Sequence, residues 1–208
     1  MVKVDNLSKI IKGKAVLSNV RVNFDYGKIY GLYGTNGSGK TMLLRAIAGL
    51  IKPTSGKVLI DDKVLRKDIS FPESVGIIIE NMELLPYLSA VDNLRLLSNI
   101  KKIASEDDIL KTLRRVGLET EDKVKKYSLG MRQKLNIAQA IFEQPDILLL
   151  DEPTNALDER SIECVHKILK EEKSRGATII IATHNKYDLE DLCDTIFQMK
   201  DGCLEVLG

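Results

Sequence analysis

The sequence predicts an α/β fold with an inserted helical subdomain and an antiparallel β region. Residues 2–7 and 20–24 alternate apolar and polar side chains, as half-buried strands do. Short apolar runs alternate with helical patterns over much of the chain, while from about residue 90 to 141 the apolar spacing is helical throughout. With 208 residues, 44% of them hydrophobic, the chain is long enough for one large domain with a real core.

The first half of the chain is predicted to form strands interrupted by one helix. Beyond the two alternating strands, a short apolar strand over residues 28–33 runs directly into a glycine-rich segment. A helical pattern covers residues 41–50, and Gly49 with Pro53 marks its end. Strands are then expected over residues 57–60 and 75–79.

The second half begins with the helical insertion, in which Gly117 is expected to follow the end of a helix. Strand character returns in the apolar run at residues 147–150. A helix is predicted over residues 159–174, with Asp158 as its N-cap. The remaining expected elements are a buried strand over residues 177–182 and a closing hairpin of residues 196–199 and 204–206.

Composition narrows the partners that the chain is expected to have. Net charge is +1, from 31 basic and 30 acidic residues, so electrostatics give no reason to expect nucleic acid. No span approaches the roughly 20 apolar residues that cross a bilayer, and no signal-peptide core stands at the N-terminus. We therefore expect a cytoplasmic chain, or one held on the cytosolic face of the membrane by a partner. Cys164, Cys193 and Cys203 are expected to be reduced thiols.

One glycine-rich segment matches G-x-x-x-x-G-K-[ST], the P-loop or Walker A pattern, at every fixed position. Its backbone N–H groups would wrap a phosphate chain, with a strand before it and a helix after it as that chemistry needs. Lys40 would reach the β- and γ-phosphates of ATP, and the Thr41 hydroxyl would ligate Mg²⁺. The segment consists of Gly34, Thr35, Asn36, Gly37, Ser38, Gly39, Lys40 and Thr41.

Two consecutive carboxylates follow the apolar strand at residues 147–150. Asp151 would hold the Mg²⁺ complex, as in P-loop NTPases generally. Glu152 would point to the other side and could polarise an attacking water. A strand that simply ends in an acidic turn is the alternative, but the P-loop makes the catalytic interpretation the stronger one.

Five fragments in this order carry a family resemblance: residues 34–41, 127–134, 148–153, 155–158 and 183–184. Together they make the chain resemble an ATP-binding-cassette (ABC) ATPase subunit over essentially its whole length. The resemblance implies a single ABC ATPase domain over residues 1–208. Its P-loop NTPase core would comprise residues 1–80 and 142–208, and its helical subdomain residues 81–141 approximately.

The resemblance also assigns roles that spacing alone does not. Ser128 and Gly130 match the family's signature motif, which covers the γ-phosphate of the ATP bound to a partner subunit. Residues 155–158 match the loop that crosses the dimer interface. His184 matches the histidine that contacts the γ-phosphate and holds the geometry of the attacking water.

Three departures from the family pattern stand out. The signature reads Tyr-Ser-Leu-Gly-Met over residues 127–131, where the family usually has Leu-Ser-Gly-Gly-Gln. Glu80 stands where the family has a glutamine, and its carboxylate could still bind Mg²⁺ or water. Ile11 stands where an aromatic side chain usually stacks on adenine, so adenine would receive only an apolar contact. The first two departures resemble exporters of lantibiotic- or bacitracin-like peptides.

The function expected from these features is an ATP-binding and ATP-hydrolysing subunit of a transporter. It would act as a homodimer or heterodimer of ATPase subunits and drive a separate transmembrane permease. A soluble ABC protein, for example a cluster-assembly ATPase, is the alternative. A different P-loop enzyme, such as a small-molecule kinase, would need neither Ser128 and Gly130 nor Glu152 after Asp151.

Overall fold

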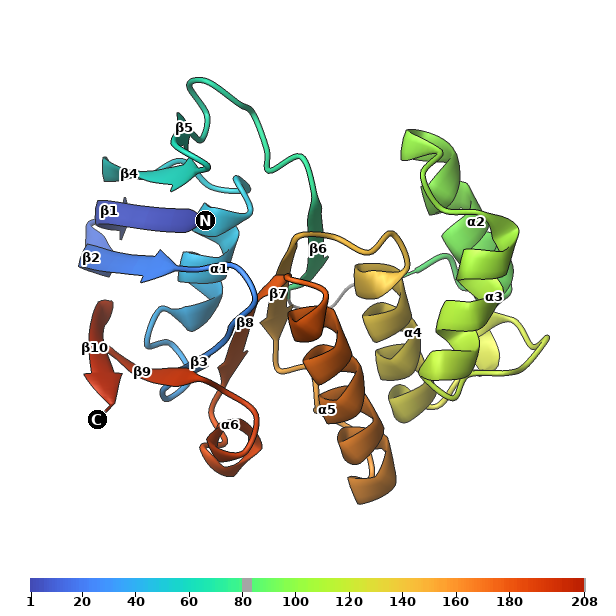
Figure 1. Ribbon diagram of the computed structural model, residues 1–208. Helices are drawn as coiled ribbons and strands as arrows, with labels where there is room; N and C mark the ends of the chain where they lie inside the picture. The colour runs from blue at the N-terminus through green and yellow to red at the C-terminus, as the bar shows by residue number, and fades with distance from the viewer. Residues whose placement is uncertain (80–83, 208) are drawn as a thin grey trace.

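A computed structural model describes residues 1–79 and 84–207, which form two β-sheets flanked by helices (Figure 1). The smaller sheet has the order β2-β1-β4-β5, and all its pairs are antiparallel. Its strands are β1 (Val2–Ile11), β2 (Lys14–Phe24), β4 (Ser55–Ile60) and β5 (Lys63–Val64). This confirms the predicted antiparallel region, although β2 begins earlier than residue 20.

The larger sheet has the order β10-β9-β3-β8-β7-β6. Its strands are β3 (Ile29–Tyr33), β6 (Val75–Ile78), β7 (Ile147–Asp151), β8 (Thr178–Thr183), β9 (Thr195–Lys200) and β10 (Cys203–Leu207). All neighbours are parallel except β9 and β10, the predicted closing hairpin. Because β3, β7 and β8 run in parallel, their carboxyl ends meet at one edge of the sheet, and the residues that follow them gather there.

Several helices lie on or near the strands. They are α1 (Lys40–Ile47), α4 (Leu129–Ile141), α5 (Glu159–Ser174) and the short α6 (Tyr187–Glu190). Helix α5 has the predicted bounds, and the Asp158 side chain caps it by accepting from the backbone N–H of Ser161 at 2.8 Å. Helix α1 ends three residues before the predicted position, because the chain turns at Gly49, where φ is 77°.

The predicted helical insertion lies between β6 and β7 in the sequence, and these two strands are hydrogen-bonded neighbours. It contains α2 (Ala90–Lys101), α3 (Glu106–Arg115), a 3₁₀ turn (Val124–Lys126) and α4. Figure 1 shows α2 and α3 on the opposite side of the molecule from the antiparallel sheet. Gly117 follows α3 with φ at 65°, as predicted for a residue just past a helix end.

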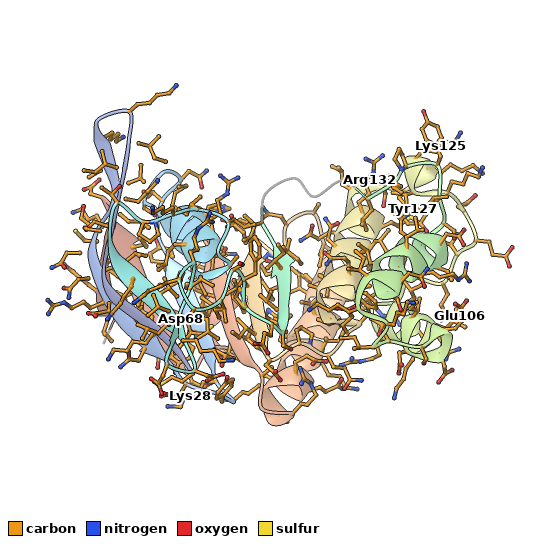
Figure 2. All side chains as sticks on the ribbon, turned by 90° about the horizontal axis from the view of Figure 1, so that it is seen from above. Lys28, Asp68, Glu106, Lys125, Tyr127 and Arg132 are labelled. Carbon is orange, nitrogen blue, oxygen red and sulfur yellow. The ribbon has the colours of Figure 1, made fainter. Side chains whose placement is uncertain are left out.

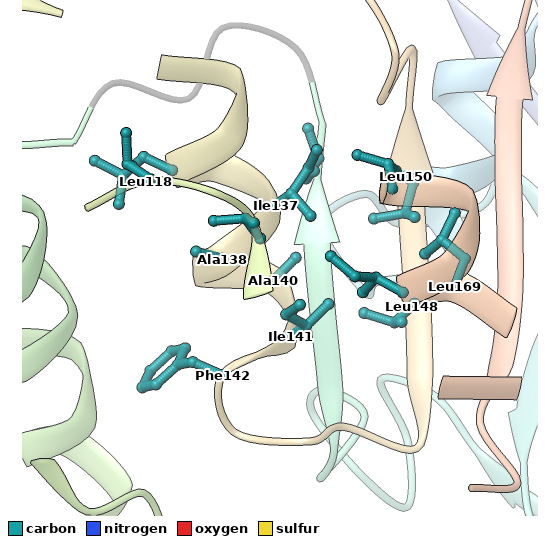
Figure 3. Packing of buried hydrophobic residues seen from close by; sticks show 14 of the residues in the cluster. Leu118, Ile137, Ala138, Ala140, Ile141, Phe142, Leu148, Leu150 and Leu169 are labelled. Carbon is teal, nitrogen blue, oxygen red and sulfur yellow. The ribbon is translucent and has the colours of Figure 1, made fainter. Parts of the chain in front are cut away.

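Helix α4 attaches this insertion to the large sheet. Its buried residues Ile137, Ala140 and Ile141 pack toward β6 and β7, as Figure 3 shows. The approach is close: a Cβ on Gly76 of β6 would lie 1.9 Å from the carbonyl oxygen of Ala140. A larger residue at position 76 would therefore separate α4 from the sheet.

Candidate functional site

The P-loop connects β3 to α1 in a conformation that requires glycine. Gly39, the residue before α1, has φ at 113°, which L side chains rarely adopt. Neighbouring backbone also leaves no room: a Cβ on Gly39 would lie 2.7 Å from the Val16 carbonyl oxygen, and one on Gly34 would lie 2.3 Å from that of Met199. The two fixed glycines of the motif are therefore structural requirements of the loop.

Lys40 is buried, with 5% of its surface exposed. Its ammonium group donates hydrogen bonds to the carbonyl oxygens of Gly34 at 2.6 Å and Thr35 at 3.2 Å. Burial lowers the pKa of Lys40, and the carboxylates of Glu152 and Asp151 act against that shift. A positive charge is thus held inside the loop, where an anion would find a partner.

Ser38 offers independent support for a phosphate in this loop. Its side chain is buried, and its hydroxyl oxygen has no hydrogen-bond partner among the described residues. Buried polar atoms in proteins are usually paired, so an unpaired hydroxyl beside a glycine-rich loop calls for a ligand. A phosphate oxygen would accept the Ser38 hydrogen bond.

Thr41 and Asp151 supply oxygen atoms next to this loop. The Thr41 hydroxyl donates to Oδ2 of Asp151 at 2.6 Å, so the ends of two motifs meet. Among the described residues no three His, Cys, Asp or Glu side chains gather into a metal site. One hydroxyl and one carboxylate suit Mg²⁺, which keeps several waters and binds phosphate oxygens rather than a cage of protein ligands.

Glu152 and His184, the two predicted catalytic residues, are brought together. Oε1 of Glu152 accepts a hydrogen bond from the backbone N–H of His184 at 3.0 Å and lies 2.7 Å from Nδ1 of the His184 ring. Oε2 accepts from the Thr183 hydroxyl at 2.9 Å. The Glu152 side chain is 20% exposed, so water can reach a carboxylate whose orientation is fixed from one side.

The signature residues begin helix α4. Ser128 is its N-cap, and its hydroxyl accepts from the backbone N–H of Met131 at 3.2 Å. Gly130 lies against the loop that follows β7, since a Cβ there would be 3.0 Å from the Ala156 carbonyl oxygen. Figure 2 shows the adjoining Tyr127 and Arg132 on the helical insertion, remote from Lys28 and Asp68. Within the described residues no hydrogen bond joins Ser128 to the P-loop.

Ile11 and Glu80 are the two remaining predicted site residues. Ile11 is the last residue of β1, is 39% exposed and pairs with Lys14 across the β1–β2 hairpin. The second strand of that hairpin passes the P-loop where Val16 approaches Gly39. Glu80, and with it the boundary between residues 80 and 81, lies outside the described residues.

Several residues around Glu152 were not identified from the sequence. Gln133 of α4 donates to the carbonyl oxygen of Pro153 at 2.8 Å. The Thr154 hydroxyl donates to Asp188 Oδ2 at 2.8 Å, and Asn185 Nδ2 donates to Asp188 Oδ1 at 2.9 Å. The spacing of Asn185 and Asp188, three residues apart just after a strand, was the one available signal, because it resembles a helix-capping pair.

A family model described as "ABC transporter" matches residues 17–155. The chain belongs to the ABC transporter family. The matched segment contains the P-loop, the signature residues, and the two carboxylates Asp151 and Glu152 at the end of β7. In the part of the chain that the structure describes, no helix is long and apolar enough to cross a membrane.

Relatives match the chain over nearly its whole length. The ABC transporter ATP-binding protein YybJ of Bacillus subtilis (strain 168) is 61% identical, over 99% of this chain and 95% of that protein. The lantibiotic transport ATP-binding protein SrtF of Streptococcus pyogenes is 38% identical, over 97% of this chain and 88% of its own. The bacitracin transport ATP-binding protein BcrA of Bacillus licheniformis is 35% identical, over 98% and 68%.

Two solved structures of the bacterial ABC transporter cassette MJ0796 show the same fold. A dimeric structure is 30% identical with a TM-score of 0.89, covering 99% of this chain and 97% of that one. A dimeric post-hydrolysis state bound to ADP and Pi is 28% identical with a TM-score of 0.88, covering 100% and 99%. The chain is thus an ATP-binding, ATP-hydrolysing subunit of an ABC transporter, and the comparisons do not favour a soluble alternative.

Proposed function

We propose that Lys40, Thr41, Asp151, Glu152 and His184 form the Mg²⁺-ATP site of this subunit. The observation that carries the proposal is the fixed Glu152 carboxylate, held by Thr183 and His184 at the edge of the sheet where the P-loop begins. A carboxylate placed beside a phosphate-binding loop, and still reached by water, suits general-base chemistry.

The P-loop would hold the triphosphate. Its backbone N–H groups and the N-terminal end of α1 favour anions, and Gly34 to Thr41 surround that position. The buried ammonium of Lys40 would exchange its bonds to carbonyl oxygens for stronger, charge-assisted bonds to phosphate oxygens. Thr41 and Asp151 would hold Mg²⁺, which when bound neutralises charge on the phosphates.

Glu152 would orient and polarise the water that attacks the γ-phosphate. The backbone N–H of His184 and the Thr183 hydroxyl hold its two oxygens, so the carboxylate cannot rotate freely. His184, with 54% of its side chain exposed, would use its free ring nitrogen to contact the γ-phosphate. These two residues would therefore act together on one water molecule.

The complete site would include a second chain. We infer that Ser128 and Gly130 of one subunit cover the ATP held by the other, in a homodimer or a heterodimer; the dimeric MJ0796 cassette supports such an assembly. The core of residues 1–80 and 142–208 would hold ATP, and the helical subdomain of about 81–141 would carry the signature.

The subunit would lie on the cytosolic face of the membrane, bound to a separate transmembrane permease. The names of SrtF and BcrA favour peptides as the cargo.

The test of the two-chain site is nucleotide-driven dimerisation of Glu152→Gln. Its amide is a poor base, so ATP should stay uncleaved and hold two subunits together. Size-exclusion chromatography in ATP and Mg²⁺ should show a dimer that is absent without nucleotide. Adding Ser128→Glu should abolish it, because a carboxylate would face the γ-phosphate. A Glu152→Gln, Ser128→Glu chain that still dimerises in ATP would contradict the proposal.

A further inference from the structure

We propose that Asp188 is a positioning residue for ATP hydrolysis, which orients Glu152 and His184 by tying together the loops that carry them. The proposal rests on the proposed catalytic role of Glu152 but adds a residue that the P-loop and signature motifs do not include. Asp188 lies on α6, and it acts through hydrogen bonds to Thr154 and Asn185 rather than through any contact with nucleotide.

The loop that carries Glu152 has a conformation that needs support. Glu152 has φ at 48° and Ala156 has φ at 64°, both in the left-handed region that L residues disfavour. Pro153 adds to the difficulty, because the residue before a proline prefers an extended backbone. Each such residue costs on the order of 1–3 kcal/mol and persists only where surrounding contacts hold it.

Asp188 supplies one of these contacts. Thr154 is buried, with 9% of its surface exposed, and its hydroxyl donates to Oδ2 of Asp188 at 2.8 Å. In the same loop, the Pro153 carbonyl oxygen accepts a hydrogen bond from Gln133 Nε2 of α4 at 2.8 Å. The two residues after Glu152 are thus held from both α4 and α6, which restrains the backbone from which the carboxylate projects.

The second oxygen of Asp188 completes a closed ring of hydrogen bonds. Oδ1 accepts from Asn185 Nδ2 at 2.9 Å, and the backbone N–H of Asn185 donates to the Thr183 hydroxyl at 3.1 Å. That hydroxyl in turn donates to Oε2 of Glu152. Hydrogen bonds thus link Thr154 to Asp188, Asp188 to Asn185, Asn185 to Thr183, and Thr183 to the Glu152 side chain. The backbone from Glu152 to Thr154 closes the ring. His184 lies between Thr183 and Asn185 in the sequence.

Asp188 is itself firmly placed. The next residue, Leu189, is fully buried, and it packs so closely on β3 that a Cβ on Gly31 would lie 2.8 Å from Leu189 Cδ1. This contact fixes the short helix α6 against the large sheet. Asp188 therefore transmits the position of the sheet to both loops.

The ring requires an acceptor with two oxygens at position 188. Oδ1 of Asn185 already accepts from the backbone N–H of Tyr187 at 3.2 Å, so this amide cannot turn over without losing that bond. An amide at position 188 has only one acceptor oxygen, so either the Thr154 hydroxyl or the Asn185 amide group would lose its acceptor. Exchanging the two side chains would restore the pattern. A carboxylate at position 185 could accept both from an amide at position 188 and from the backbone N–H of Tyr187.

The experiment compares steady-state ATP hydrolysis by the purified subunit in Asp188→Asn, Asn185→Asp and the double exchange. A displacement of about 1 Å can slow a reaction by roughly a hundredfold, so we expect each single variant to lose about tenfold or more in kcat. The KM for ATP should change less than about twofold, since within the described residues the side chains of Asp188 and Asn185 make no hydrogen bond to the P-loop, although the Thr183 carbonyl oxygen accepts from the backbone N–H of Gly34. The double exchange should recover most of the kcat lost by either single variant.

Asp191→Asn is the matched control. Asp191 is an exposed carboxylate three positions further on, and its side chain makes no hydrogen bond or ion pair with any described residue. The Asp191→Asn variant undergoes the same change of charge as Asp188→Asn and should hydrolyse ATP at the wild-type rate. Thermal melting of every variant separates loss of fold from loss of positioning.

The outcomes distinguish this inference from the proposed function on which it rests. Retained hydrolysis in Glu152→Gln would refute the proposed function itself. If Glu152→Gln is inactive while Asp188→Asn keeps a normal kcat, only the role of Asp188 is wrong. A double exchange that folds but stays as slow as the single variants, or a kcat loss matched by a loss of ATP affinity, would likewise overturn the role.

Discussion

The hydroxyl of Thr41 donates a hydrogen bond of 2.6 Å to Oδ2 of Asp151, although these residues are 110 positions apart in the sequence. Thr41 stands in the first turn of α1, which follows β3, and Asp151 ends β7. Strand β8 lies between β3 and β7, and all three run in parallel. The parallel sheet therefore brings two distant motifs together, with the two oxygens that we propose as Mg²⁺ ligands in hydrogen-bond contact.

Replacing Thr41 by valine should weaken the binding of Mg²⁺ to the ATP-loaded subunit. Valine keeps the shape of the side chain but removes the hydroxyl, and a hydrogen bond or contact with a charged group is worth about 1.5 kcal/mol or more. The Mg²⁺ concentration for half-maximal hydrolysis should rise about tenfold. Titration of MgCl₂ at saturating ATP checks this, and ATP binding in EDTA should be unaffected. An unchanged Mg²⁺ midpoint would remove Thr41 from the metal site.

Lys40→Ala should abolish hydrolysis. The variant removes the buried ammonium that would contact the phosphates, and charge-assisted bonds are about twice as strong as neutral ones. Lys167→Ala, at an exposed position on α5, is the matched control and should turn over normally. ATPase assays with equal protein concentrations test both. Turnover by Lys40→Ala at the wild-type rate would exclude this loop as the phosphate site.

Ile11→Tyr should tighten nucleotide binding. If Ile11 contacts the base, an aromatic ring would add stacking worth roughly 1 kcal/mol or more, about fivefold in affinity. ATP and GTP titrations should both respond, because stacking tolerates either base. Ile10→Tyr is the control, since neighbouring strand residues project to opposite faces. Equal affinities in Ile11→Tyr and wild type would mean that the base lies elsewhere.

His166 should make the fold sensitive to acid. Burial lowers the pKa of His166, and Lys170 adds to the shift, while Asp188 and Asp191 oppose it. Nε2 is buried without a partner among the described residues, so a proton there would carry an unpaired charge. Since the unfolded pKa is about 6.5 and the folded pKa is lower, this contribution is complete above pH 6.5 and is lost as pH falls below it.

The measurement is urea unfolding at pH 7.5 and pH 5.5. The wild-type protein should lose free energy of unfolding between these values, and His166→Gln should lose less of it. A variant with the same loss as the wild type would show that other groups determine the acid sensitivity.

Local motifs predicted from the sequence which segments gather at the edge of the large sheet. The spacing of Gly34 to Thr41 and the order of strand and helix placed the loop between β3 and α1, and the apolar run before Asp151 placed that carboxylate at the end of β7. The bounds of α5 were also predicted, and Asp158 marks the first of them chemically as the N-cap. The end of α1 was predicted three residues too late, although Gly49, where the chain turns with φ at 77°, was recognised in the sequence as a marker of that end.

The support around Glu152 could not be predicted for a different reason. Thr154 and Asp188 are 34 positions apart, and each is an ordinary polar residue in its own segment. The packing of Leu189 against Gly31 of β3, distant in the sequence, holds α6 where Asp188 reaches the loop after β7. Hydrogen bonds that depend on such long-range packing leave no periodic or motif signal in the sequence.

We propose above all that the Glu152 carboxylate, held by Thr183 and His184, activates the attacking water. Single-turnover hydrolysis of prebound ATP tests it most directly, because neither ATP binding nor product release enters the rate. General-base catalysis contributes about 10²–10⁴-fold, so Glu152→Gln should be slower than wild type by at least about a hundredfold, with ATP affinity retained. Glu143→Gln, at a half-buried carboxylate just after α4, should match the wild type. A Glu152→Gln rate within about twofold of wild type would contradict the claim.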